Sequence, residues 1–208
     1  MTEIAIPAGG QPLPATLRQP SHPGGVVVFV HGSGVDRHDA RDVRIAQALG
    51  DAGFATLQPE LLDARQACDP CNALDLELHG SRLLQALDWL EREPWAAGLP
   101  LGLFGAGIGA GVALLAAASR PERIAAVVCR DGRPDTALFR ASSVTAATLM
   151  LVEEDGWPYR EVYEALPGPK ELLVVPSGSG VFDEPAAIGA VAQHAQRWFS
   201  SHLVKRAA

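Results

Sequence analysis

A glycine-rich turn is the part of this sequence best suited to chemistry. Residues 105–111 read GAGIGAG, after the apolar run Leu101–Phe104 and before the uncharged, helically spaced stretch Ile108–Ser119. In sheets of parallel strands, ligands bind beyond the carboxyl ends of the strands, which makes a turn of this kind a candidate site. Two incompatible interpretations fit it.

The first interpretation is a dinucleotide-binding turn. Gly105, Gly107 and Ala110 match the pattern G-x-G-x-x-G/A, and Asp131 follows the next apolar run, near the place of a ribose-binding carboxylate. That fingerprint normally opens the first strand–helix–strand unit of its domain, but here two strand–helix units precede it. Nucleotide binding therefore stands as an alternative.

The second interpretation is a nucleophile elbow, the strand-to-helix turn G-x-S-x-G of serine hydrolases. Residues 105–109 match it except at the nucleophile, where Gly107 stands. The loop His31-Gly32-Ser33-Gly34 follows an earlier apolar run, where an oxyanion loop is expected. Asp155 follows the run 147–152, where the acid belongs, and the loop 176–182 occupies the place of the histidine. The order nucleophile, acid, histidine is that of the α/β-hydrolases.

Apolar runs and helical spacings alternate along most of the chain. They predict strands in 3–19 (a pair with a turn at Gly9-Gly10), 25–30, 54–59, 101–104, 124–129, 147–152 and 171–175, and helices over 39–53, 74–93, 108–119, 159–166 and 185–204. A polar loop joins the strand 54–59 to the helix 74–93. The alternation predicts a mostly parallel central sheet with helices on both faces, in a single domain spanning 1–208 without a large lid domain.

These segments resemble the dienelactone-hydrolase-like branch of the α/β-hydrolases from about Val26 to Phe199. The resemblance rests on VFVHGSG with Arg37, His38 and Arg41 after it, and on LFGAGIGAGVALLAAA, VVCRDGRPD and VVPSGSGVFDEP. It implies an α/β-hydrolase fold and a Ser, Asp and His triad. This chain shows Gly107, Asp155 and Gly180 at the three positions.

Glycine supplies neither the attacking hydroxyl nor the imidazole that accepts its proton. Loss of the nucleophile alone costs a serine protease about 10⁶ in turnover, so hydrolysis by the family mechanism is expected to be absent. Gly107 would expose the amino end of a helix starting at Ile108, which favours carboxylates and phosphates. We therefore expect an enlarged pocket with an anion-favouring floor, with Asp155, Glu153 and Glu154 on its far side.

Other residues complete the expected pocket. Trp157 is predicted to line it, and the arginines of the charged segment 36–41 are predicted to brace the loop or the pocket edge. His38 in that segment could act as a general base in a new chemistry, although a structural role is the simpler interpretation.

The three cysteines do not form a disulfide framework. Cys68 and Cys71 form a C-x-x-C pair that is either redox-active or without a role, and a zinc site would need two further ligands, of which only His79 is close in sequence. Cys129 is expected to be a small buried core residue rather than a replacement nucleophile. No metal and no cofactor are expected.

Composition narrows the choice of partners. The 208 residues include 17 basic and 24 acidic side chains, a formal net charge of −7, which argues against nucleic acid. Gly98–Ser119 is uncharged, but its proline and glycines favour a strand, a turn and a helix over a membrane span. The first residues show no secretory signal, so a cytoplasmic location is expected. A homodimer is left open.

The sequence therefore predicts a hydrolase homologue that binds a small ligand, an anionic one included, or a protein partner. One alternative is an enzyme with non-hydrolytic chemistry in the same pocket, such as a lyase, isomerase or cyclase using Asp155 or His38. The other is nucleotide binding by residues 105–111. Whether any catalysis remains is left open.

Overall fold

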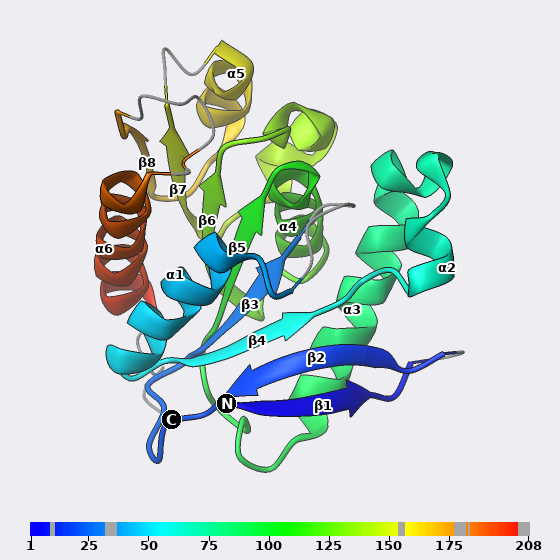
Figure 1. Cartoon of the computed structure of the whole chain (residues 1–208). Coiled ribbons are helices and arrows are strands. Elements are labelled where there is room, and N and C mark those ends of the chain that lie inside the picture. The colour runs from blue at the N-terminus through cyan, green and yellow to red at the C-terminus, as the bar shows by residue number, and fades with distance from the viewer. Residues whose placement is uncertain (9–10, 32–36, 154–156, 177–181, 183, 204–208) are drawn as a thin grey trace.

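A computed structural model describes residues 1–8, 11–31, 37–153, 157–176, 182 and 184–203. Eight strands form one sheet in the order β1-β2-β4-β3-β5-β6-β7-β8 (Figure 1). The strands β3 to β8 are parallel, and β2 and β1 extend one edge in the antiparallel sense. Their bounds are β1 (Thr2–Ile6), β2 (Leu13–Arg18), β3 (Val26–Val30), β4 (Ala55–Pro59), β5 (Leu101–Ala106), β6 (Ile124–Arg130), β7 (Ala147–Val152) and β8 (Lys170–Val174).

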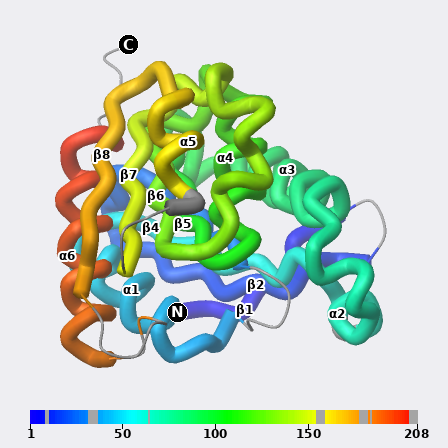
Figure 2. The backbone as a smooth tube through the Cα atoms, turned by 90° about the horizontal axis from the view of Figure 1, so that it is seen from above, coloured from blue at the N-terminus to red at the C-terminus, as the bar shows by residue number. Residues whose placement is uncertain are grey.

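Helices cover both faces of this sheet, as the alternation predicts. On one face α1 (Ala40–Asp51) packs beside α6 (Pro185–His202), and their apolar side chains share a core with those of the sheet. The other face carries α3 (Leu76–Arg92), α4 (Ile108–Ser119), η2 (Pro134–Ser143) and α5 (Trp157–Ala165). Figure 2 shows the two helical layers from above.

The buried strands follow from their composition. All five residues of β3 are buried, and Val27 and Phe29 face the α1 side while Val26, Val28 and Val30 face the α4 side. A strand covered on both faces requires such an uninterrupted apolar run. The uncharged stretch before Ser119 is β5, a turn and α4, as expected. None of the helices in the described residues is both long and apolar enough to cross a membrane.

Two segments contain more regular structure than the sequence patterns indicate. The predicted polar loop with the cysteine pair contains α2 (Ala64–Ala67) and η1 (Pro70–Leu74). Asp63 begins α2 through a capping box with Gln66, and the Asp69 side chain accepts the Cys71 N–H at the start of η1. Both turns depend on local side-chain caps, which a search for apolar periodicity does not detect. The second segment is η2, which follows β6 and packs on α4 and α5.

The strand predictions are one or two residues short where it matters for the site. β5 continues past Phe104 to Ala106, and β6 continues past Cys129 to Arg130, because Ala106 pairs with Arg130 in the parallel ladder. The carboxyl ends of β3, β5 and β6 therefore lie side by side, with the glycine turn immediately beyond β5.

Candidate active site at the glycine turn

The turn after β5 is sharp and centres on Gly107. This residue has φ 60° and ψ −129° and stands directly before the first residue of α4, with no side chain capping the helix. A residue with a side chain rarely adopts this backbone conformation, and strained residues of this kind are common at functional sites. The geometry fits the nucleophile-elbow interpretation of the turn.

Space around the turn distinguishes Gly107 from its neighbours. A Cβ atom added to Gly107 would meet no atom within 4 Å. At four nearby glycines it would collide: Gly105 (2.5 Å from Gly109 O), Gly109 (2.0 Å from Val30 O), Gly111 (2.0 Å from Thr136 Oγ1) and Gly132 (2.1 Å from Gly107 O). Close packing therefore requires glycine at those four positions, whereas at Gly107 there is room for a side chain.

Two backbone segments contact the turn from either side. On one side, the place of a Gly109 Cβ is occupied by Val30 O and lies 3.3 Å from the carbonyl carbon of His31. On the other, the Arg133 N–H donates to Gly107 O at 3.0 Å, and Gly132 packs against the same oxygen. Movement of either segment would change the surroundings of the turn.

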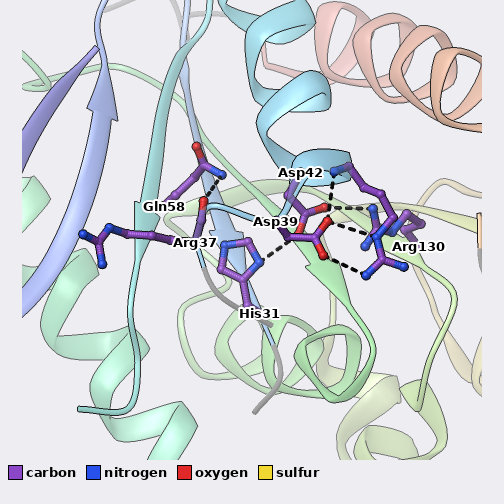
Figure 3. A network of polar contacts seen from close by, with 7 residues as sticks. His31, Arg37, Asp39, Asp42, Gln58 and Arg130 are labelled. Carbon is purple, nitrogen blue, oxygen red and sulfur yellow. Dashed lines mark hydrogen bonds and ion pairs between the residues drawn. The ribbon is translucent and has the colours of Figure 1, made fainter. Parts of the chain in front are cut away.

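A buried ionic network lies beside these segments on the α1 side of the sheet (Figure 3). Asp42, in the first turn of α1, is fully buried; its Oδ2 lies 2.9 Å from His31 Nδ1 and its Oδ1 lies 2.8 Å from Arg130 Nη1. His31 and Arg130 are only 6% and 5% exposed. Burial alone would raise the pKa of the Asp42 carboxyl, but His31 and Arg130 outweigh it and hold the pKa below its ordinary value.

Ion pairs anchor the charged segment before α1, and the role of its arginines at the pocket edge stays a prediction. Arg37 forms ion pairs with Glu3 and Glu60, and its backbone oxygen accepts a bond from Gln58 at 3.3 Å. Arg41 pairs with Asp39, the residue that caps α1. His38 is exposed in the turn between them, and its place in the pocket stays a prediction.

On the α4 side of the sheet, Cys129 is completely buried, and burial raises the pKa of its thiol to about 12. The thiolate is therefore absent at neutral pH, and the expectation of a core residue is confirmed. Tyr159 in α5 is also buried, and its hydroxyl has no hydrogen-bond partner in the part of the chain that the structure describes. Burial and the nearby Asp131 raise the pKa of this phenol well above its usual range.

Several predicted site residues lie outside the described residues. They are Gly32, Ser33 and Gly34 of the expected oxyanion loop, Asp155 at the acid position and Gly180 at the histidine position. The backbone of Trp157 begins α5. Glu153 directly follows β7, and its carboxylate accepts the backbone N–H of Phe182. Phe182 is the last residue of the loop 176–182, in which the histidine position is predicted.

Two further features of the chain are the pair Cys68 and Cys71 and any cluster of side chains that could bind a metal ion. Cys68 and Cys71 are free and exposed. Within the described ranges, no group of three or more His, Cys, Asp or Glu residues could hold a metal ion.

Sequence reasoning missed Asp42 and Arg130. Asp42 lies on the same face of α1 as Ile45, Ala46 and Leu49, so a carboxylate on an apolar helix face was the available signal. Arg130 ends an otherwise apolar buried strand, which is a signal of the same kind. Neither signal names the partner, because the three members of the network belong to different elements, which meet only in the folded chain.

A scan of protein-family models finds no match to this chain. Among solved structures, the dienelactone hydrolase from Anabaena variabilis is 38% identical, with a TM-score of 0.92 and 97% of each chain covered. Est1E from Butyrivibrio proteoclasticus (15% identical, TM-score 0.76, 95% of this chain and 99% of that chain covered) shares the fold. So does the mouse α/β-hydrolase domain-containing protein 10 (13% identical, TM-score 0.76, 97% and 99% covered).

Among curated proteins, a Mycobacterium tuberculosis protein named "Putative phosphoribosyl transferase" is 42% identical over 205 residues. The match covers 97% of this chain but only 46% of that protein, so the chain spans about half the length of this relative. The near-complete match to the Anabaena protein, at 38% identity over 97% of both chains, shows the family. By this match and by its strand order, the chain belongs to the dienelactone hydrolase family of the α/β-hydrolases.

Proposed function

We propose that this chain is a dienelactone-hydrolase-like protein that lacks the Ser and His of the hydrolytic triad and binds a small ligand at the glycine turn. Gly107 stands at the nucleophile position, and Gly180 is proposed for the histidine position. The observation that carries the proposal is the geometry of Gly107. The turn has the shape that presents a nucleophile and has room for a side chain, but it carries none.

The chemistry of such a site favours binding over hydrolysis. Without a hydroxyl or thiol at position 107 no covalent acyl intermediate can form there, and Cys129 is protonated at neutral pH. The first N–H groups of α4 have no side-chain cap at Gly107, and the positive end of the helix dipole lies there. A ligand with a carboxylate or phosphate group suits this environment.

Phosphoribosyl transfer is not proposed for this chain. The name of the Mycobacterium relative belongs to a protein of about twice the length, and this chain matches 46% of it. The matching part folds here as an α/β-hydrolase sheet. Fold and name do not by themselves transfer an activity.

The test measures hydrolysis of a short aryl ester by four proteins. These are the natural chain, Gly107→Ser alone, Gly107→Ser with Gly180→His, and the matched control Gly107→Ala with Gly180→His. The control carries the same backbone strain and the same new imidazole but lacks the hydroxyl. We expect turnover only from the Ser and His double variant. Hydrolysis by the natural chain well above a heat-denatured sample would refute the loss of activity.

Ligand binding has its own test. The natural chain would be screened by thermal shift against small carboxylates and phosphate esters, with neutral amides of the same carboxylates as controls. A ligand held at 100 times its dissociation constant stabilises the folded state by about 2.7 kcal/mol, which is readily detected. We expect the anions to stabilise the protein more than the amides, and less so in Gly107→Asp, which places a carboxylate at the turn.

A further inference from the structure

We propose that Asp42 is the positioning residue of the glycine turn: its buried carboxylate holds His31 and Arg130, and through them the two backbone segments that contact the turn, one at Gly109 and one at Gly107 O. The inference takes the turn as the ligand site and in that respect rests on the proposed function. It goes beyond it by assigning a role to a residue of α1 outside the family's triad.

The first connection runs through His31. This residue directly follows β3, and its ring lies in the core between Asp42 and Phe29, with 6.1 Å between the centroids of the two rings. Its main chain belongs to the segment packed against the first turn of α4 at Gly109. A fixed ring therefore fixes the backbone at the start of the loop that follows β3.

The second connection runs through Arg130, the last residue of β6. Its guanidinium forms an ion pair with the Asp42 carboxylate and lies over the ring of Phe104, with Cζ 5.9 Å from the ring centroid. The next residue, Asp131, has φ 50°, and the turn it opens places Gly132 and the Arg133 N–H on Gly107 O. The position of Arg130 therefore sets where this turn leaves the sheet.

The contacts of Asp42 extend across β5, the strand that leads into the glycine turn. Ala106, the residue before Gly107, pairs with Arg130 on one side, and β3 flanks β5 on the other. The carboxylate thus joins the ends of the two strands that enclose β5. Figure 3 shows it between His31 and Arg130, reached from α1.

Stability alone is a weak reason for this arrangement. Burying an Asp and an Arg costs much of what their attraction returns, and apolar residues of similar volume often stabilise a core as well or better. The neighbours of Asp42 on α1 are apolar core residues. What the ionic network adds is a link between three elements, since moving His31 or Arg130 away from Asp42 would leave a buried polar group without its partner.

The test separates local from global effects by amide hydrogen exchange, resolved by residue. The reporters are the Arg133 and Ala110 N–H groups, which donate to Gly107 O, and the Asp131 N–H, which donates to Leu151 O. The reference is the set of core amides of α3. In Asp42→Asn we expect the reporters to exchange about tenfold faster relative to the reference than in the natural chain.

Two further variants make the result decisive. Asp42→Asn with Arg130→Gln removes both buried charges, so protection in α3 should recover while the reporters stay fast. His31→Gln leaves the Asp42 and Arg130 pair intact and should loosen Ala110, even if Asp42→Asn fails to fold. Asp88→Asn, on α3 itself, breaks the distant ion pair with Arg120, and in this control the reporters should keep the exchange rates of the natural chain.

A uniform acceleration of reporters and reference in Asp42→Asn, or their joint recovery in the double variant, would overturn the proposal. It would show that Asp42 only stabilises the core. Normal reporter protection in His31→Gln would overturn it as well. None of these outcomes depends on ester hydrolysis or on a ligand, so failure of this inference is distinguishable from failure of the proposed function.

Discussion

The two faces of the sheet beside Gly107 are built by different means. On the α1 face, the fully buried carboxylate of Asp42 joins His31 and Arg130 at distances of 2.9 and 2.8 Å. On the α4 face, glycines of the turn leave no room for a side chain, and a Cβ at Gly109 would lie 2.0 Å from Val30 O. Beside Gly107, ion pairs hold the elements of the α1 face together. On the α4 face, the backbones approach closely because the residues in contact are glycines.

The difference teaches which change each face tolerates. A buried charge network does not tolerate the removal of one charge, because the remaining partner is left buried and unpaired. A face of small residues has no charge to lose, but it has no room for an added methyl group. The following predictions test this contrast.

The largest effect is expected at Asp42. Asp42→Asn leaves the Arg130 guanidinium without its buried counter-charge, which should lower the free energy of unfolding by about 3–5 kcal/mol. Urea denaturation followed by tryptophan fluorescence measures it, with Asp88→Asn as the matched surface control. A loss no larger than that of the control would show that the network contributes little on the α1 face.

The next effect is on the α4 face. Gly109→Ala places a methyl group against the backbone oxygen of Val30, and we expect a loss of about 2–3 kcal/mol because neither backbone can yield easily. The same urea titration measures it. An unchanged midpoint would mean that α4 and β3 can separate at this point without cost.

A smaller loss is expected at Gly107, where space is available but the backbone conformation is not one that side chains favour. Gly107→Ala should cost about 1–2 kcal/mol, less than Gly109→Ala, because only the strain of φ 60° contributes. Comparing the two alanine variants under identical conditions separates strain from collision. The reverse order would contradict the open surroundings of Gly107.

The smallest expected effect is on the stability of the folded protein at acidic pH. Hydrogen bonding to Arg41 lowers the pKa of Asp39 from 3.8 to about 2. Because the folded-state pKa is the lower one, this stabilisation is present above about pH 4 and is lost as the pH falls toward 2. Asn also caps helices, so Asp39→Asn should remove about 1 kcal/mol of this pH dependence while keeping the cap. Parallel stability curves for both proteins between pH 2 and 5 would argue against the assignment.

Much of the fold could be predicted from local patterns. The uninterrupted apolar residues of β3 indicate a strand covered on both faces, and the bounds of α4 and β7 agree with the predicted ones. These elements are encoded by residues next to one another in sequence, which is why periodicity finds them. The short turns α2 and η1 were missed because single capping side chains begin them.

The candidate site was predictable only in part. The pattern around Gly107 identifies the turn, and the structure gives that residue the expected sharp conformation. The pattern cannot show that the surroundings of Gly107 are open while those of Gly109 are filled, because the atoms next to Gly109 belong to Val30 and His31, which are distant in sequence. The roles of Asp155 and Gly180 stay predictions, since both lie outside the described residues.

The sequence by itself determined the order of strands and helices and the place of the glycine turn, because apolar periodicity and glycine act over a few neighbouring residues. Only the tertiary structure decided that Asp42 meets His31 and Arg130. Their attraction depends on distance and on exclusion of water, and both arise when α1, β3 and β6 pack together. Nothing in the sequence next to Asp42, His31 or Arg130 indicates that these side chains come into contact, because the contacts form only when the sheet and α1 assemble.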